Sequence, residues 1–378
     1  MSRPQQARVV LLAAAACAVG VAGCGDGREA LPQPALPTLP QETELPLVPS
    51  DIEAATSPLA GMHSCEPDDS PVAALIGSDS EESESGASDI WTMTVDGELV
   101  PLTSDGHSLD PWMSHDGERL YFTRSAGGTE GDAPALGRGL WVLDLDSGTE
   151  SLLYEAAEGS AVNRPEASAD GNAVVFDMLG GDAERQRVYV LDVTSGEATE
   201  LPMPPDDGSF QGQQGPTWGP DGAAVAYLHT RADPETAAIV WTVRVVELST
   251  FAEKIVHETR DPIGLVGLEW SPDGRALLVT EIGQTPGEPD MGATAVSIDI
   301  ASADPTVLAE QVPFDVTYAG ADGQTVAAVG PLREDTQDPS SAQQPWLTIW
   351  DNGEMVLADA PVALTSAHSL TIADCAFD

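Results

Sequence analysis

Hydrophobic and polar residues alternate along most of the chain in short runs that are typical of β-strands. One run reads Leu120-Tyr121-Phe122-Thr123, and another, Leu140-Trp141-Val142-Leu143, ends in the carboxylate of Asp144. Runs of four to eight residues that are rich in aromatic and β-branched side chains, bounded by Gly, Asp, Ser or Asn, predict strands joined by tight turns. The pattern therefore predicts an all-β fold.

A turn motif of the form small-x-Asp-Gly follows these runs at a nearly constant interval. Asp hydrogen-bonds its own backbone and Gly accepts a positive φ, so each Asp-Gly pair suits a hairpin. A period near 50 residues is typical of a β-propeller with one four-stranded antiparallel blade per repeat. The pairs stand 49 to 54 residues apart and are Asp116-Gly117, Asp170-Gly171, Asp221-Gly222, Asp273-Gly274 and Asp322-Gly323.

Each repeat has an inner strand before the turn and three further strands after it. The first repeat is less regular, and its three later strands are expected at 72–77, 90–95 and 98–102. Further inner-strand signals occur at 66–69 and at 372–375, so the chain holds seven of them and six sets of the other three strands. This pattern predicts a six-bladed ring in which both chain ends meet at one blade.

The run Trp270-Ser271-Pro272-Asp273-Gly274 and its degenerate copies resemble the WD-like repeat of the TolB family of six-bladed propellers. The resemblance covers residues 62–378 and concerns the propeller alone, without the N-terminal α/β domain of that family. It implies a non-enzymatic scaffold that binds another component of the cell envelope. Propellers also host catalysis, so the repeat indicates the fold more strongly than the function.

The N-terminus has the features of a bacterial lipoprotein signal. Arg3 and Arg8 precede an apolar run at 9–21, and Val21-Ala22-Gly23-Cys24 resembles a lipobox. We expect a signal peptide at 1–23, lipidation of Cys24, a Pro-rich tether at 24–61 and the propeller at 62–378; an ordinary secretory signal is the alternative. No other stretch approaches the ~20 apolar residues of a membrane span. The protein is thus expected on the periplasmic or cell-surface side, anchored by lipid alone.

The chain is strongly acidic, with 62 Asp and Glu against 15 Lys and Arg and a formal net charge of −47. Such a field argues against binding of nucleic acid or anionic lipid. It favours solubility, cations, basic partners or a saline habitat. We expect a monomeric propeller whose partner is a basic envelope protein or peptide. Loops on a rigid scaffold are frequent binding sites, and we expect docking on those that join the second and third strands, such as the acidic segment at 78–89.

Two cysteines remain for the fold once Cys17 is removed with the signal and Cys24 is lipidated. Cys65 and Cys375 lie beside the first and the last inner-strand signals. Export favours oxidation, and a disulfide between them would lock the closure of the ring. A reduced buried pair and an intermolecular bridge are the alternatives.

Sequence motifs for catalysis are absent: there is no Gly-x-Ser-x-Gly, no His-Glu-x-x-His and no phosphate-binding glycine loop. His107 and His368 precede equivalent inner strands and are the candidate metal ligands of an alternative function, a metal-dependent lactonase- or cyclase-like enzyme. A cation- or carbohydrate-binding module is a further alternative. The aspartates of the repeat are interpreted as structural turn residues, and we expect neither a catalytic site nor a cofactor.

Overall fold

The computed structural model describes residues 73–372 except 79–88, 95–97, 115, 126–136, 181–182, 204–210, 261–262, 285–290, 314–315, 320–322, 332–344, 352 and 358–365. The chain divides into two compact units, Met1–Thr56 and Ser57–Asp378, and all described residues belong to the second. No helix in the described ranges is long and apolar enough to cross a membrane. The calls on Cys24, Cys65, Cys375, Asp322 and the acidic segment at 79–88 lie outside these ranges.

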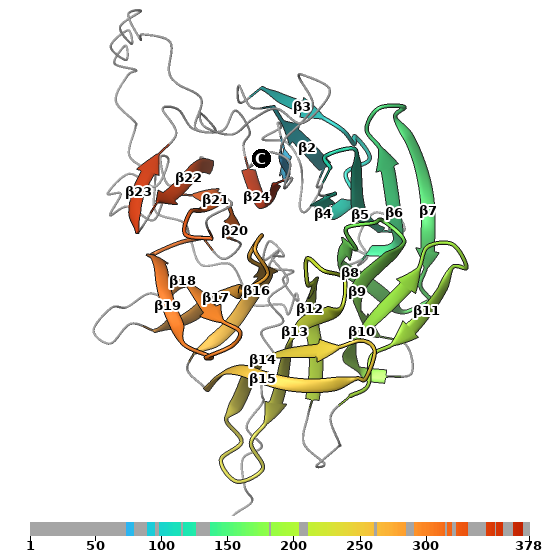
Figure 1. The fold of residues 1–378 in the computed structure, drawn as a ribbon. Helices are drawn as coiled ribbons and strands as arrows, with labels where there is room; N and C mark the ends of the chain where they lie inside the picture. The colour runs from blue at the N-terminus through green and yellow to red at the C-terminus, as the bar shows by residue number, and fades with distance from the viewer. Residues whose placement is uncertain are drawn as a thin grey trace, which may run out of the picture. The chain divides into compact units, whose positions relative to one another are not determined.

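The described strands form six antiparallel sheets of four strands, placed around a common centre (Figure 1). This arrangement confirms the predicted all-β, six-bladed propeller. Blades 1 to 3 are β24 (Ser366–Ile372), β1 (Ala73–Ser78), β2 (Asp89–Met93) and β3 (Leu99–Pro101); β4 (Ser108–Met113), β5 (Arg119–Ser125), β6 (Gly137–Asp144) and β7 (Thr149–Glu155); and β8 (Ser160–Ala167), β9 (Ala173–Gly180), β10 (Ala183–Asp192) and β11 (Glu197–Glu200).

Blades 4 to 6 repeat the same order of strands from the ring centre outward. They are β12 (Gln211–Trp218), β13 (Ala224–Ala232), β14 (Ile239–Glu247) and β15 (Ala252–Arg260); β16 (Gly264–Trp270), β17 (Ala276–Gln284), β18 (Met291–Asp299) and β19 (Pro305–Glu310); and β20 (Thr317–Tyr318), β21 (Val326–Pro331), β22 (Pro345–Asp351) and β23 (Glu354–Leu357).

Blade 1 is built from both ends of the described chain. Its inner strand is β24, the last strand, which pairs antiparallel with β1, the first, so that Ile372 faces Ala73 and Ser366 faces Ser78. This pairing accounts for the surplus inner-strand signal near the C-terminus. The other early signal, at 66–69, lies outside the described residues.

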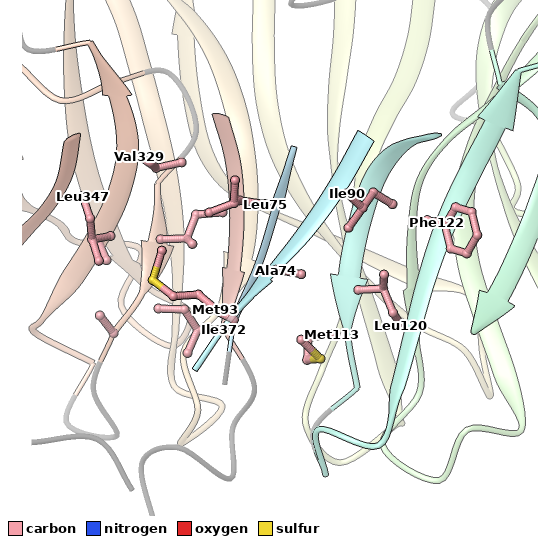
Figure 2. Close-up of a cluster of buried hydrophobic side chains, with 14 of the residues drawn as sticks. Ala74, Leu75, Ile90, Met93, Met113, Leu120, Phe122, Val329, Leu347 and Ile372 are labelled. Atoms are coloured by element: carbon pink, nitrogen blue, oxygen red, sulfur yellow. The ribbon is translucent and has the colours of Figure 1, made fainter. Parts of the chain in front are cut away.

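A buried apolar cluster joins blades 6, 1 and 2 at this closure (Figure 2). Leu75 and Ile90 of blade 1 are fully buried, and they lie in one cluster with Leu120 of blade 2 and Leu347 of blade 6. Ile372 of β24 is 8% exposed and belongs to the same cluster. The strand that closes the ring therefore also completes the core at this point.

Inner strands bulge at one repeated position. At this bulge one residue of the strand takes a positive φ, which costs a non-glycine residue about 1–2 kcal/mol. The residues are Asp110 (φ 48°), Arg164 (φ 48°), Gly215 (φ 56°), Gly267 (φ 59°) and Ser369 (φ 54°). Proline follows three of them, at 111, 165 and 216.

Hydrogen bonds between inner strands join neighbouring blades. The Glu166 carboxylate of blade 3 accepts bonds from the Trp218 backbone N–H (2.8 Å) and the Thr217 hydroxyl (3.1 Å) of blade 4. The Trp218 indole donates to the Glu166 carbonyl (3.0 Å). Blade 5 repeats the pattern toward blade 6, where Glu269 accepts from the Tyr318 backbone N–H (3.3 Å). These bonds fix the angle between blades as well as their spacing.

Three outer strands also carry a bulge, at Leu153 of β7, Val256 of β15 and Leu308 of β19. Val256 and Leu308 are 2% and 5% exposed, whereas Ile255 and Val307, which directly precede them, are 48% and 57% exposed, as expected for successive residues of a strand that point to opposite faces. Exposed aliphatic residues thus recur at the rim of these blades.

Candidate binding site

The repeat aspartates bond within their own turns. The Asp170 carboxylate accepts from the Ser168 hydroxyl (2.7 Å) and from the Asn172 backbone N–H (3.0 Å), while Gly171 has a φ of 67°. Asp116, Asp221 and Asp273 make the matching bond to the backbone N–H two residues on. Each turn belongs to a different blade. Gly117, Gly222, Gly274 and Gly323 have φ between 65° and 71°.

These bonds make the propeller sensitive to acid. Hydrogen bonds from Ser168 and Asn172 hold the pKa of Asp170 below its ordinary value, and bonds from Ser195 and Ser302 do so for Asp192 and Asp299. A carboxylate with a depressed folded pKa stabilises the fold above its unfolded pKa of about 3.9, and that stability is lost as the pH falls through the folded value. We expect the melting temperature to fall below about pH 4. Thermal melts from pH 7 to pH 2.5 will show a shallower fall in Asp170→Asn than in the exposed control Asp146→Asn, and parallel curves would contradict the assignment.

The two histidines proposed as metal ligands are not shown to meet. His107 is exposed; its backbone N–H donates to Asp105 (2.7 Å) and its carbonyl accepts from the Ser125 N–H (3.0 Å). His368 pairs with Ile76 through the backbone of β24, and its side chain is outside the described set. In the described ranges no three His, Cys, Asp or Glu side chains lie close enough to hold a metal.

A polar network that the sequence did not predict lies around the inner strands of blades 2 to 4, with Asp177 of β9 at its centre. Asp177 is fully buried; it accepts from the Gln186 side chain (2.6 Å), the Asn163 side chain (3.1 Å) and the Gly215 backbone N–H (2.8 Å). The Arg164 guanidinium, on a side chain that is 35% exposed, lies 3.6 Å from the same carboxylate. Asp177 therefore fixes both the bulge of blade 4 and the position of Arg164.

Asp110 of blade 2 bonds the bulge residue of blade 3, as Asp177 of blade 3 bonds the bulge residue of blade 4. The Asp110 carboxylate accepts from the Arg164 backbone N–H and, at 3.3 Å, from the Thr123 hydroxyl. Burial raises the pKa of Asp110, although the Arg164 charge opposes this shift. The sequence signal for this network is the residue that precedes proline at the bulge of the inner strand. It is Asp110 in blade 2 and Arg164 in blade 3.

A hollow of about 350 Å³ opens between blades 2 and 3, at the end of the blades where the Asp-Gly turns lie. One wall is the face of blade 2, formed by alternate residues of β5, β6 and β7. The other wall is formed by Gly171 and Val193 of blade 3. Arg119 and Tyr121 of β5 reach it side by side, and the guanidinium hydrogen-bonds the Tyr121 hydroxyl. A Cβ on residue 171 would lie 2.9 Å from the Arg119 guanidinium, so glycine there gives this side chain its room.

The arrangement of the six blades resembles that of known TolB structures. TolB from Acinetobacter baumannii has a TM-score of 0.57 at 15% identity, over 83% of this chain and 69% of that one. A protein from Agrobacterium tumefaciens assigned to TolB gives 0.50 at 13% identity, over 79% and 91%. The ring is a TolB-like propeller. No family model and no curated protein matches the sequence.

The TolB-like propeller also matches an oligogalacturonate lyase in complex with manganese, at 17% identity and a TM-score of 0.48, over 71% of this chain and 70% of that one. At these identities the likeness concerns the fold. Because one fold hosts many functions, the function of the TolB-like propeller has to be argued from its surfaces.

Proposed function

We propose that this protein is a lipid-anchored component of the bacterial cell envelope whose propeller is a non-enzymatic scaffold for a basic protein or peptide. The observation that supports this proposal best is the likeness of the ring to TolB, which covers 83% of the chain. Its closure buries residues from three blades in one cluster. A frame of this kind presents loops in a fixed arrangement, which lowers the entropic cost of binding.

The charge of the chain supports a basic partner. A net charge of −47 accelerates encounter with a positively charged surface and repels acidic ones. Within blades 2 to 5, many of the few cations are already paired. Arg124 contacts Glu150 at 2.7 Å, Arg244 contacts Glu253 at 2.6 Å, and Arg187 contacts Glu200 at 3.1 Å. These pairs leave the excess of carboxylates to set the field outside the molecule.

Attachment to the membrane is proposed from the sequence alone. The basic start, the apolar run and the lipobox-like Val21–Cys24 support export and lipidation of Cys24. The prolines of the tether favour an extended chain at about 3.1 Å per residue, which gives residues 24–61 a reach of up to roughly 120 Å from the membrane. A scaffold held on such a tether can meet partners within the envelope.

The test is capture of envelope proteins on the immobilised full chain at increasing salt. We expect a basic protein to be retained at low ionic strength and released as salt rises, because screening weakens the attraction. A variant with Asp79, Glu81, Glu82 and Glu84 changed to their amides should retain less of it. Equal retention by the variant, or retention that does not respond to salt, would contradict docking at the acidic segment.

Metal binding distinguishes the proposed scaffold from the alternative function, a metal-dependent enzyme. We expect that zinc or calcium at one equivalent leaves the melting temperature of the full chain unchanged. A saturable shift at one equivalent that disappears in His107→Ala and His368→Ala would instead support a metal-dependent enzyme and overturn the proposed function.

A further inference from the structure

Blade 2 differs from blades 3, 4 and 5 in two residues that line the hollow. Arg119 faces Asp144 across the β5–β6 pair. The residues that face the matching carboxylates of blades 3, 4 and 5 are Ala173, Ala224 and Ala276. Two residues further along the same strands, Tyr121 is replaced by Val175, Ala226 and Leu278. Blade 2 thus carries a cation and a phenol where blades 3 to 5 have aliphatic side chains.

The outer strand β7 supplies three alternate residues to the hollow. Thr149 and Ser151, both exposed, and Leu153 line the hollow from this strand. At about 350 Å³, its volume is within the range of about 300–1,000 Å³ that is usual for small-ligand sites.

The lining balances its charges. It holds one cation, Arg119, and one carboxylate, Asp144, which already accepts both the hydroxyl and the backbone N–H of Ser147 at 2.7 and 2.8 Å. An anionic ligand would meet the repulsive field of the whole chain. A cation would be attracted by that field, but inside the hollow it would meet the Arg119 guanidinium, which repels it, beside a single carboxylate. Both charged classes of ligand are therefore disfavoured relative to a neutral one.

The remaining lining suits a ligand with many hydroxyl groups. The hydroxyls of Thr149 and Ser151 can each donate or accept, and the Arg119 guanidinium carries several donors in a fixed plane. Tyr121 is only 2% exposed, and its hydroxyl holds the Arg119 guanidinium in place. Aliphatic side chains lie among them and can cover the C–H face of a sugar ring. These are Val142, Leu153 and Val193.

We propose that the hollow between blades 2 and 3 is a binding site for a short neutral saccharide, separate from the surface that docks the protein partner. Arg119 donates to the sugar oxygens, Ser151 and Thr149 exchange hydrogen bonds with its hydroxyls, and the aliphatic residues pack against its ring. The site would let the scaffold hold a glycan and a protein at the same time.

Titration calorimetry of the full chain with cellobiose, maltose and N,N′-diacetylchitobiose tests the proposal. We expect saturable binding of at least one of them, and no binding of the charged sugars glucuronate and glucosamine. Arg119→Ala and Ser151→Leu should each weaken binding at least about tenfold, because one removes a charged donor and the other fills the hollow. Arg119→Ala should fold normally, since alanine stands at the matched position of blades 3 to 5.

Thr306→Leu is the matched control, because Thr306 faces Ser297 on β18 as Ser151 faces Val142 on β6, and it is also exposed. It should bind as the unmodified chain does. The proposal is overturned if none of the three disaccharides gives saturable heat, or if binding survives both Arg119→Ala and Ser151→Leu. It is overturned too if the neutral tripeptide Ser-Gly-Ser binds in the hollow more tightly than every saccharide.

Discussion

A chain that ends before β24, at residue 365, is expected to lose the cooperative unfolding of the propeller. The truncation removes the inner strand of blade 1 and leaves the inner edge of β1 without its partner. It also removes Leu370 and Ile372 from the cluster that joins three blades. Loss of one buried aliphatic side chain costs about 2–5 kcal/mol, and a domain has only about 5–15 kcal/mol in all. Differential scanning calorimetry should show no cooperative transition.

A permuted chain provides the control for this truncation. Ile372 faces Ala73 as Trp270 faces Leu277 in blade 5, where six residues make the connecting turn. Placing residues 366–372 before β1 with Ser-Pro-Asp-Gly-Arg-Ala between them should give blade 1 the same hairpin and restore the transition. A truncated chain that still melts cooperatively at an unchanged temperature would show that β24 does not close the ring.

Reduction of a Cys65–Cys375 disulfide is expected to produce the second large effect. We propose this bond because the two cysteines lie in the segments next to β1 and β24, whose ends face each other at Ala73 and Ile372. A cross-link over so long a loop stabilises a fold by about 4–5 kcal/mol in the chain-entropy account. The melting temperature of the oxidised chain should therefore fall by many degrees in reductant.

The paired variant Cys65→Ser with Cys375→Ser is the control for reduction. It should melt at the temperature of the reduced chain and should not respond to dithiothreitol. Alkylation of the unreduced, denatured chain should label neither cysteine. Labelling of both thiols would contradict the bond, and a dimer on a non-reducing gel would indicate an intermolecular bridge instead.

The sequence predicts the blades because the turn chemistry is local. Asp170 and Gly171 bond within six residues of chain, so their spacing reports the repeat directly. Ring closure follows from the surplus inner-strand signal near Ile372, since strands in a closed ring must all be paired. The prediction of the fold rests on these two features, the local turn and the number of strand signals.

The network around Arg164 could not be predicted in the same way. The Asp177 carboxylate is bonded to Asn163 in its own blade and to the backbone of Gly215, 38 residues away in the next blade. Such contacts depend on the angle between blades, which no periodicity of the chain encodes. The hollow beside Arg119 is completed by Gly171 and Val193 of the neighbouring blade. A comparison of repeats would mark Arg119 as exceptional, but it would not show the space beside it.

The pairing of β1 with β24 also determines when, during synthesis of the chain, the ring can close. Roughly 300 residues separate the two strands, and synthesis at about 5–20 residues per second delivers the second some 15 to 60 s after the first. During that interval the ring cannot be complete, because Leu75 and its neighbours on β1 await the strand that buries them. If the chain is exported unfolded across a membrane, as we propose, a native state that can form only after β24 has been made keeps the chain competent for export. Because β24 closes the ring, folding of the propeller cannot be completed until synthesis has passed β24.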